Sequence, residues 1–246
     1  MKPTILHLDQ VDSTNLFLSE FCKKNTVDSG FVVWAENQTA GRGQMGTTWL
    51  SRKGENLTFS IYIQWKDFPI EDQFLFQQMI SLSLIYILET YGLRNLSVKW
   101  PNDIYCGGEK IAGILVENSL LGSCIDSSII GIGLNVNQMD FTGINKKVTS
   151  MFHHLGLEVD RSKLINQITS DLLLKSKSIL KNKTVYQESY LEQLYRNEGV
   201  HPFMDAKKNR FQAKILGIDS IGRLILEKQD GTNEAYALKE ITFLID

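Results

Sequence analysis

The chain has 246 residues, of which 43% are hydrophobic and 22% charged, and its formal net charge is −2. This length suits one large domain with a small addition, and the near-neutral charge lacks the basic excess of nucleic-acid-binding domains. No apolar run reaches the roughly 20 residues that span a bilayer, and no signal peptide is recognised, so we expect a cytoplasmic protein without a membrane. The cysteines, Cys22, Cys106 and Cys124, lack metal-ligand or disulfide spacing, which predicts free thiols.

The N-terminal half alternates strand and helix patterns. Residues 4–8 predict an opening strand, and the amphipathic run from Thr14 to Lys24 predicts a short helix. Residues 56–63 alternate β-branched and aromatic side chains, as strands do. The apolar stretch from Asp72 to Tyr91 predicts a long buried helix that ends at Gly92.

A glycine-rich loop at residues 36–46 follows an apolar strand pattern and contains one arginine, Arg42. Such a loop can present backbone N–H groups and a guanidinium to an anion. Its glycines, at positions 41, 43 and 46, match GxGxxG, but a dinucleotide-binding unit needs a helix directly after them. Here the strand pattern of residues 56–63 comes next. A ligand-free surface loop is the other interpretation.

A second polar group follows in the middle of the chain. Residues 98–105 and 107–117 predict two strands joined by a Gly-Gly turn, with Pro101 at the end of the first and Lys110 at the start of the second. Residues 129–137 predict a further strand that ends in asparagines. Taken separately, Asn102 and Asp103 suit a turn, Lys110 a solvated strand end and Asn135 a loop cap.

The C-terminal half begins with two predicted helices, from Arg161 to about Leu180 and from Thr184 to Asn197. From His201 onward short alternating runs are broken by turn residues, which predicts a small antiparallel β-module. We therefore expect two domains, residues 1–199 and 200–246.

Five blocks in order resemble those of the biotin protein ligases: 12–15 (DSTN), 38–43 (QTAGRG), 100–103 (WPND), 110–117 (KIAGILVE) and 131–135 (GIGLN). The resemblance covers roughly residues 9 to 137. It implies an α+β fold, a mixed β-sheet backed by helices as in class II aminoacyl-tRNA synthetases and biotin–lipoate ligases, with a C-terminal SH3-like β-barrel. Because the pattern starts near residue 9, we expect the short form without an N-terminal DNA-binding domain, no repressor function and no nucleic acid partner.

The resemblance implies a two-step reaction with ATP and biotin as substrates and Mg²⁺ as cofactor. Biotin is activated to biotinyl-5′-AMP with release of pyrophosphate, and is then transferred to a lysine of a biotin carboxyl carrier protein. In the activation step the biotin carboxylate must meet the α-phosphate of ATP, so cations and aligned N–H donors are needed between these two anions. Arg42 and Lys110 are the predicted catalytic cations. A homodimer is compatible with the resemblance.

The ureido ring of biotin requires both donors and acceptors, which short polar side chains supply. The resemblance places eight residues around biotin: Ser13, Thr14, Asn15, Gln38, Arg42, Gly43, Gln44 and Lys110. Ser13 also suits an ordinary helix N-cap. The substrates of lipoate or octanoate ligases and transferases offer only an apolar ring or chain beyond the carboxylate, so this polar group argues against that alternative. A non-catalytic vitamin-binding module would need neither Arg42 nor Lys110.

The predicted ATP-binding residues are Arg42, Trp49, Asn102, Lys110 and Asn135. Trp49 suits either stacking on adenine or core packing. Asp103 suits either Mg²⁺ binding next to the phosphates or a base for the acceptor lysine, and the sequence leaves both roles open. Related ligases often carry further basic residues where this chain has Gln44, Met45 and Thr47, so retention of the biotinyl-adenylate is an open question.

Overall fold

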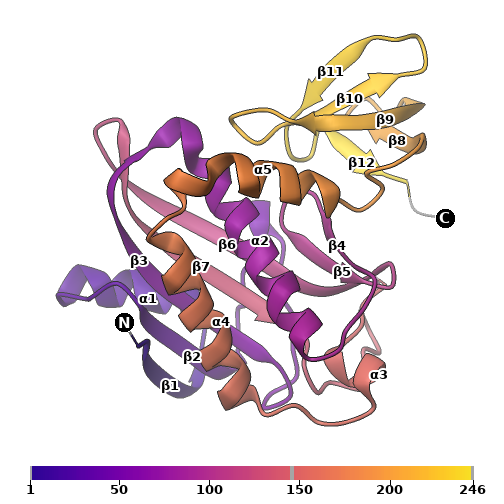
Figure 1. Cartoon of the computed structure of the whole chain (residues 1–246). Helices are drawn as coiled ribbons and strands as arrows, with labels where there is room; N and C mark the ends of the chain where they lie inside the picture. Colours follow the sequence, from indigo (N-terminus) through magenta and orange to yellow (C-terminus); the bar gives the residue numbers. More distant parts are fainter. Residues whose placement is uncertain (1, 145–146, 245–246) are drawn as a thin grey trace.

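The computed structural model describes residues 2–144 and 147–244. Its larger sheet has seven strands in the order β1-β2-β3-β7-β6-β5-β4 (Figure 1). Only the β1–β2 pair is parallel among these neighbours, which confirms the predicted mixed sheet. The strands are β1 (Thr4–Val11), β2 (Phe31–Gln38), β3 (Leu57–Pro69), β4 (Leu96–Lys99), β5 (Asp103–Cys106), β6 (Glu109–Leu121) and β7 (Cys124–Leu134).

Helices cover both faces of this sheet. Three of them, α2 (Gln73–Thr90), α4 (Arg161–Ser176) and α5 (Lys183–Glu192), lie together in front of the sheet in Figure 1. Helix α2 is apolar around most of its circumference and is therefore buried between the sheet and its neighbours. Helix α1 (Thr14–Lys24) contacts β2, β3 and β7 from the opposite face. A short helix, α3 (Met151–Leu155), completes the set.

The helix predictions hold better at their starts than at their ends. Helix α1 has the predicted bounds. Helix α4 ends at Ser176, before the predicted Leu180, and a separate 3₁₀ turn occupies Leu180–Asn182. Helix α5 ends at Glu192, five residues before Asn197. The overlong predictions arise because the amphipathic pattern continues through segments in which the backbone has already turned.

The single strand predicted over residues 98–105 is wrong. The chain turns at residues 100–102, with a cis Trp100–Pro101 peptide, and forms the hairpin β4–β5. Proline cannot donate to a β-ladder, so a turn is the better place for it. Helix α5 supports the turn, because the Tyr190 hydroxyl donates to the Pro101 carbonyl at 2.9 Å. The predicted Gly-Gly turn is confirmed: Gly107 and Gly108 have φ values of 60° and 84° between β5 and β6.

The C-terminal module is a five-stranded antiparallel sheet in the order β11-β10-β9-β8-β12, as expected for an SH3-like unit. Figure 1 shows it beside α5, at one end of the larger sheet. Its strands are β8 (His201–Asp205), β9 (Arg210–Ile218), β10 (Leu224–Lys228), β11 (Asn233–Tyr236) and β12 (Ile241–Phe243).

Gly222 anchors this module to the rest of the protein. Its carbonyl accepts a hydrogen bond from the buried Trp100 indole N–H at 2.9 Å. It has a φ of +92°, and a Cβ there would lie 2.4 Å from the Phe74 ring, so only glycine fits. A second contact joins the Arg196 guanidinium to the Leu244 carbonyl at 2.8 Å. The module is therefore held against the turn at residues 100–102, directly before Asp103.

Candidate active site

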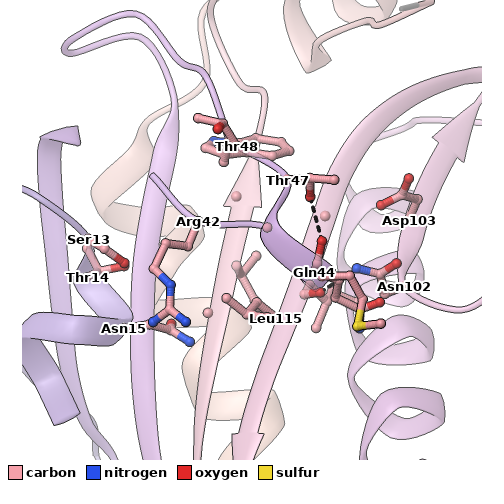
Figure 2. A pocket seen from close by; sticks show the side chains of 18 of the residues that line it. Ser13, Thr14, Asn15, Arg42, Gln44, Thr47, Thr48, Asn102, Asp103 and Leu115 are labelled. Atoms are coloured by element: carbon pink, nitrogen blue, oxygen red, sulfur yellow. Dashed lines mark hydrogen bonds between the residues drawn. The ribbon is translucent and has the colours of Figure 1, made fainter. Parts of the chain in front are cut away.

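A cavity of about 220 Å³ lies between α1, the glycine loop, the larger sheet and the C-terminal module (Figure 2). Polar side chains from distant segments meet there, and Figure 2 shows Arg42 beside Asn15, with Asn102 and Asp103 beyond Gln44. The cavity is lined by Ser13, Thr14, Asn15, Gln38, Arg42, Gly43, Gln44, Met45, Thr47, Thr48, Trp49, Phe59, Asn102, Asp103, Lys110, Gly113, Ile114, Leu115, Gly131, Ile132, Gly133, Leu238 and Lys239.

The start of α1 forms a buried polar wall. Ser13 is the N-cap residue of α1, but its hydroxyl makes no capping hydrogen bond, so it is available to a ligand. The Gln38 side-chain oxygen accepts from the Thr14 backbone N–H at 2.8 Å. Ser60, on β3, lies with its hydroxyl 2.7 Å from Thr14 Oγ1 and 2.6 Å from Asn15 Oδ1. These contacts fix the orientation of the wall before any ligand binds.

Glycines on β7 make room for two of the site side chains. A Cβ on Gly131 would lie 2.2 Å from Asn15 Oδ1, and one on Gly133 would lie 2.3 Å from the Trp49 ring. The Trp49 ring therefore stands directly on the strand backbone, with the Lys110 ammonium 5.6 Å from the ring centroid. Its indole N–H is buried without a partner among the described residues. Trp49 thus packs on the sheet and also borders the cavity, which accommodates both predicted roles.

Arg42 is held by a carboxylate from the neighbouring strand. Its guanidinium lies 3.0 Å from Glu117 Oε1, and the other oxygen of Glu117 accepts from the Asn15 amide at 2.8 Å. Glu117, on β6, therefore ties the glycine loop to the start of α1. Both members of this ion pair are partly exposed, so its direct contribution to stability is small, about 0–1 kcal/mol. Its main effect is to orient the guanidinium.

Lys110 and Asp103 form the second ion pair of the cavity, with Nζ 2.5 Å from Oδ1. Lys110 lies at the start of β6, and Asp103 begins β5 after the turn at residues 100–102. Asn102 secures that turn, because its amide donates to the Ile114 carbonyl at 2.7 Å. Burial raises the pKa of Tyr190 well above its usual value, so this phenol remains a neutral donor to the turn. Lys110 and Asp103 are thus held in place by their ion pair and by the hydrogen bonds of the turn.

Asn135 lies behind the cavity. It is 3% exposed and does not line the cavity, and its amide donates to the Thr149 carbonyl at 2.9 Å. The Thr149 backbone N–H in turn donates to the Lys110 carbonyl, also at 2.9 Å. In this structure Asn135 therefore supports the segment beside Lys110. Its predicted contact with ATP stays a prediction.

Comparisons with known proteins agree on the family. Residues 8–135 match the model of the biotin/lipoate A/B protein ligase family. The chain is 30% identical to the bifunctional ligase/repressor BirA of Bacillus spizizenii, over 95% of this chain and 72% of that protein. It is 29% identical to the biotin–[acetyl-CoA-carboxylase] ligase of Mycobacterium tuberculosis, over 66% of this chain and 60% of that one.

A solved structure is similar over nearly the whole chain. The biotin protein ligase of Aquifex aeolicus, in complex with biotin and ATP, superposes with a TM-score of 0.80 and 25% identity, covering 99% of both chains. This protein belongs to the biotin/lipoate A/B protein ligase family. The structural similarity extends through the C-terminal module, whereas the family model matches only residues 8–135.

The sequence prediction named eleven of the 23 residues that line the cavity. All of the predicted biotin-site residues line it, as do Trp49, Asn102 and Asp103, whereas Asn135 does not. Reasoning from sequence missed Glu117, Ser60 and Lys239. Glu117 stands at the end of a recognised block and Ser60 interrupts an apolar strand, which were usable signals. No local pattern pointed to Lys239.

The described residues contain neither a group of metal ligands nor a helix that could span a membrane. In residues 2–144 and 147–244, no three His, Cys, Asp or Glu side chains are grouped as metal ligands. In the same ranges, each helix is too short or too polar to cross a membrane.

Proposed function

We propose that this protein is an ATP-dependent biotin–protein ligase, which activates biotin to biotinyl-5′-AMP and transfers it to a lysine of a carrier domain. The observation that carries the proposal is that Arg42 and Lys110 line one cavity with the polar wall at the start of α1. The likeness to a ligase solved with biotin and ATP supports both substrates. The biotin–[acetyl-CoA-carboxylase] ligase among its relatives supports a carrier protein as acceptor.

In the first step the biotin carboxylate attacks the α-phosphorus of ATP, and pyrophosphate leaves. Arg42 holds the carboxylate and the α-phosphate together, because a guanidinium can contact two anions in its plane. Lys110 stabilises the negative charge that develops on the phosphate oxygens. Asp103 keeps Lys110 in place at 2.5 Å.

In the second step the neutral amine of the acceptor lysine attacks the carbonyl of the biotinyl-adenylate. The carbon–nitrogen bond forms, the bond to the phosphate oxygen breaks, and AMP leaves. The amine must lose a proton, which Asp103 or water takes. The same Lys110 neutralises the departing phosphate.

The polar wall favours biotin over lipoate. Ser13 offers a buried hydroxyl that makes no capping bond, and Gln38 and Thr14 supply further donors and acceptors next to it. A site that hydrogen-bonds a polar ring rejects an analogue without those groups, since its buried polar atoms would be left unpaired.

The direct test uses the purified protein with MgATP, biotin and a biotin carboxyl carrier domain. We expect pyrophosphate release that depends on biotin, and one biotinylated lysine on the carrier by mass spectrometry. Lipoate in place of biotin should give at most a small fraction of that rate. Equal rates with both acids, or no labelled carrier and no biotinyl-adenylate, would refute the proposal.

Replacing Asp103 by asparagine should lower the rate of adenylate formation about ten- to hundredfold, because Lys110 loses its charged partner. The measurement is single-turnover formation of biotinyl-AMP, followed separately from transfer to the carrier. Asp126→Asn, on β7 outside the cavity lining, is the matched control and should behave as the parent. Intact adenylation with failed transfer would instead make Asp103 the base for the acceptor lysine.

The proposal also covers the metal ion, the domains and the location of the enzyme. Asp103 would hold Mg²⁺ together with the ATP phosphates, since Mg²⁺ usually binds through one or two carboxylates plus substrate phosphates. The ligase reaction is assigned to residues 1–199, with residues 200–246 as the SH3-like domain. We place the enzyme in the cytoplasm, without a membrane or nucleic acid partner and with a homodimer as the compatible assembly.

A further inference from the structure

The charges of the cavity cancel in pairs. Arg42 is matched by Glu117 at 3.0 Å, and Lys110 by Asp103 at 2.5 Å. The proposed reaction brings a carboxylate and a triphosphate into this space, and Mg²⁺ offsets only part of their charge. In a site with low dielectric, two such anions repel strongly unless another cation is present. Arg42 and Lys110 each already have a carboxylate partner, so a further cation without one would add net positive charge for the two anions.

Lys239 is the third cation that lines the cavity, and it comes from the C-terminal module. Its ammonium donates to the backbone carbonyl of Met45, in the glycine loop, at 2.8 Å. Among the residues that the structure describes, Lys239 forms no ion pair, in contrast to Arg42 and Lys110. Its ammonium is therefore held by a neutral carbonyl and not by a carboxylate.

The position of Lys239 is set by its turn and by the docking of its module. The turn is closed by the Glu240 carboxylate, which accepts from the Ala237 backbone N–H at 2.7 Å, and Lys239 itself has a φ of 74°. The buried hydrogen bond from Trp100 to Gly222 fixes the module. Lys239 is thus presented to the cavity from an anchored element.

The glycine loop itself carries little positive charge. Between positions 41 and 48 the loop has a single basic residue, Arg42, since Gln44, Met45 and Thr47 are neutral. Lys239 contacts this stretch directly, at Met45. The C-terminal module therefore supplies a charge that the loop lacks.

We propose that Lys239 binds a phosphate group of ATP, exchanging the Met45 carbonyl for a phosphate oxygen when the nucleotide enters. The inference rests on the proposed ligase function and adds a nucleotide-binding residue to that site. A hydrogen bond from an ammonium to a phosphate is charge-assisted and stronger than one to a neutral carbonyl, so the exchange is favourable. Lysine suits this role because it acts on phosphate as a mobile point charge.

The test compares Lys239→Gln with Lys208→Gln and Lys239→Arg. Lys208 is an exposed lysine of the same module with a similar φ of 68°, so its variant controls for charge and for backbone conformation. We expect Lys239→Gln to raise KM for ATP about tenfold or more, with KM for biotin changed less than twofold. Lys239→Arg should restore most of the ATP affinity, and Lys208→Gln should match the parent.

Two further measurements separate phosphate binding from a structural role. In Lys239→Gln, KM for ATP should depend less on salt than in the parent, because one charge interaction with the phosphates is gone. Calorimetric binding of ATP without biotin should show the same loss of affinity. An unchanged KM for ATP would overturn the inference. So would an equal rise in both KM values with a lowered melting temperature, since that indicates loop disruption.

Failure of the Lys239 inference can be distinguished from failure of the proposed ligase function. If the parent forms no biotinyl-adenylate, the ligase proposal fails, and ATP calorimetry on parent and variants still decides whether Lys239 binds the nucleotide. If the parent is active and Lys239→Gln binds ATP as the parent does, only the inference about Lys239 is wrong.

Discussion

Replacing Lys110 by alanine should slow formation of biotinyl-AMP about a hundred- to a thousandfold, the range typical of losing one donor to a developing oxyanion. The Lys110 ammonium lies 5.6 Å from the centroid of the Trp49 ring, and it is held by Asp103. Without it, charge on the phosphate oxygens develops next to an uncompensated carboxylate. Single-turnover adenylation, with the product quantified by mass spectrometry, measures the effect.

Lys183→Ala is the control for Lys110→Ala. Lys183 also pairs with an aspartate, Asp72, but it lies outside the cavity lining. Both variants should keep their free energy of unfolding within about 1 kcal/mol of the parent, since partly exposed ion pairs contribute little to stability. If Lys110→Ala turned over as the parent does and lost several kcal/mol of stability, Lys110 would be a structural residue.

The parts of the fold that local pattern determines were predictable. Helix α1 has its predicted bounds because the polar residues before Thr14 and the amphipathic run after it act over a few positions. The Gly107–Gly108 turn followed in the same way, since positive φ at two successive residues favours glycine.

Where tertiary contacts decide, the sequence was insufficient. The run at residues 98–105 has the pattern of one strand, but the turn within it is held by Tyr190 of α5, which bonds to Pro101, and by Gly222 of the C-terminal module, which bonds to Trp100. Those partners are 89 and 122 positions away along the chain, beyond the reach of any local pattern. The hairpin β4–β5 therefore required the structure.

The residues of the site also fall into those that a local pattern identifies and those whose role depends on tertiary contacts. Residues in recognised blocks, such as Arg42 and Lys110, were identified because their types and order match a family pattern. Glu117 and Lys239 act through partners 102 and 194 positions away, so their roles depend on how separate elements come together. Gly133 illustrates the intermediate case, since a glycine within an apolar strand signals a close approach without naming Trp49 as the neighbour.

Replacing Arg42 by alanine should lower the rate of adenylation about a hundredfold or more and should weaken biotin and ATP together, because one guanidinium serves both anions. Biotin binding should also weaken for a second reason. Glu117, which now lies 3.0 Å from the guanidinium, would be left unpaired and would repel the incoming carboxylate. ATP–pyrophosphate exchange with biotin, together with binding of each substrate by calorimetry, measures both losses.

The double variant Arg42→Ala with Glu117→Gln separates these two sources. If repulsion from Glu117 accounts for part of the loss, the double variant should recover several-fold in biotin affinity over Arg42→Ala while remaining far below the parent. Arg52→Ala is the control, since Arg52 follows the same loop and pairs with Asp140 outside the cavity lining. Equal exchange activity in Arg42→Ala and the parent would remove Arg42 from the catalytic assignment. An unimproved double variant would instead mean that the guanidinium acts through its own contacts with the two substrates, with Glu117 serving only to orient it.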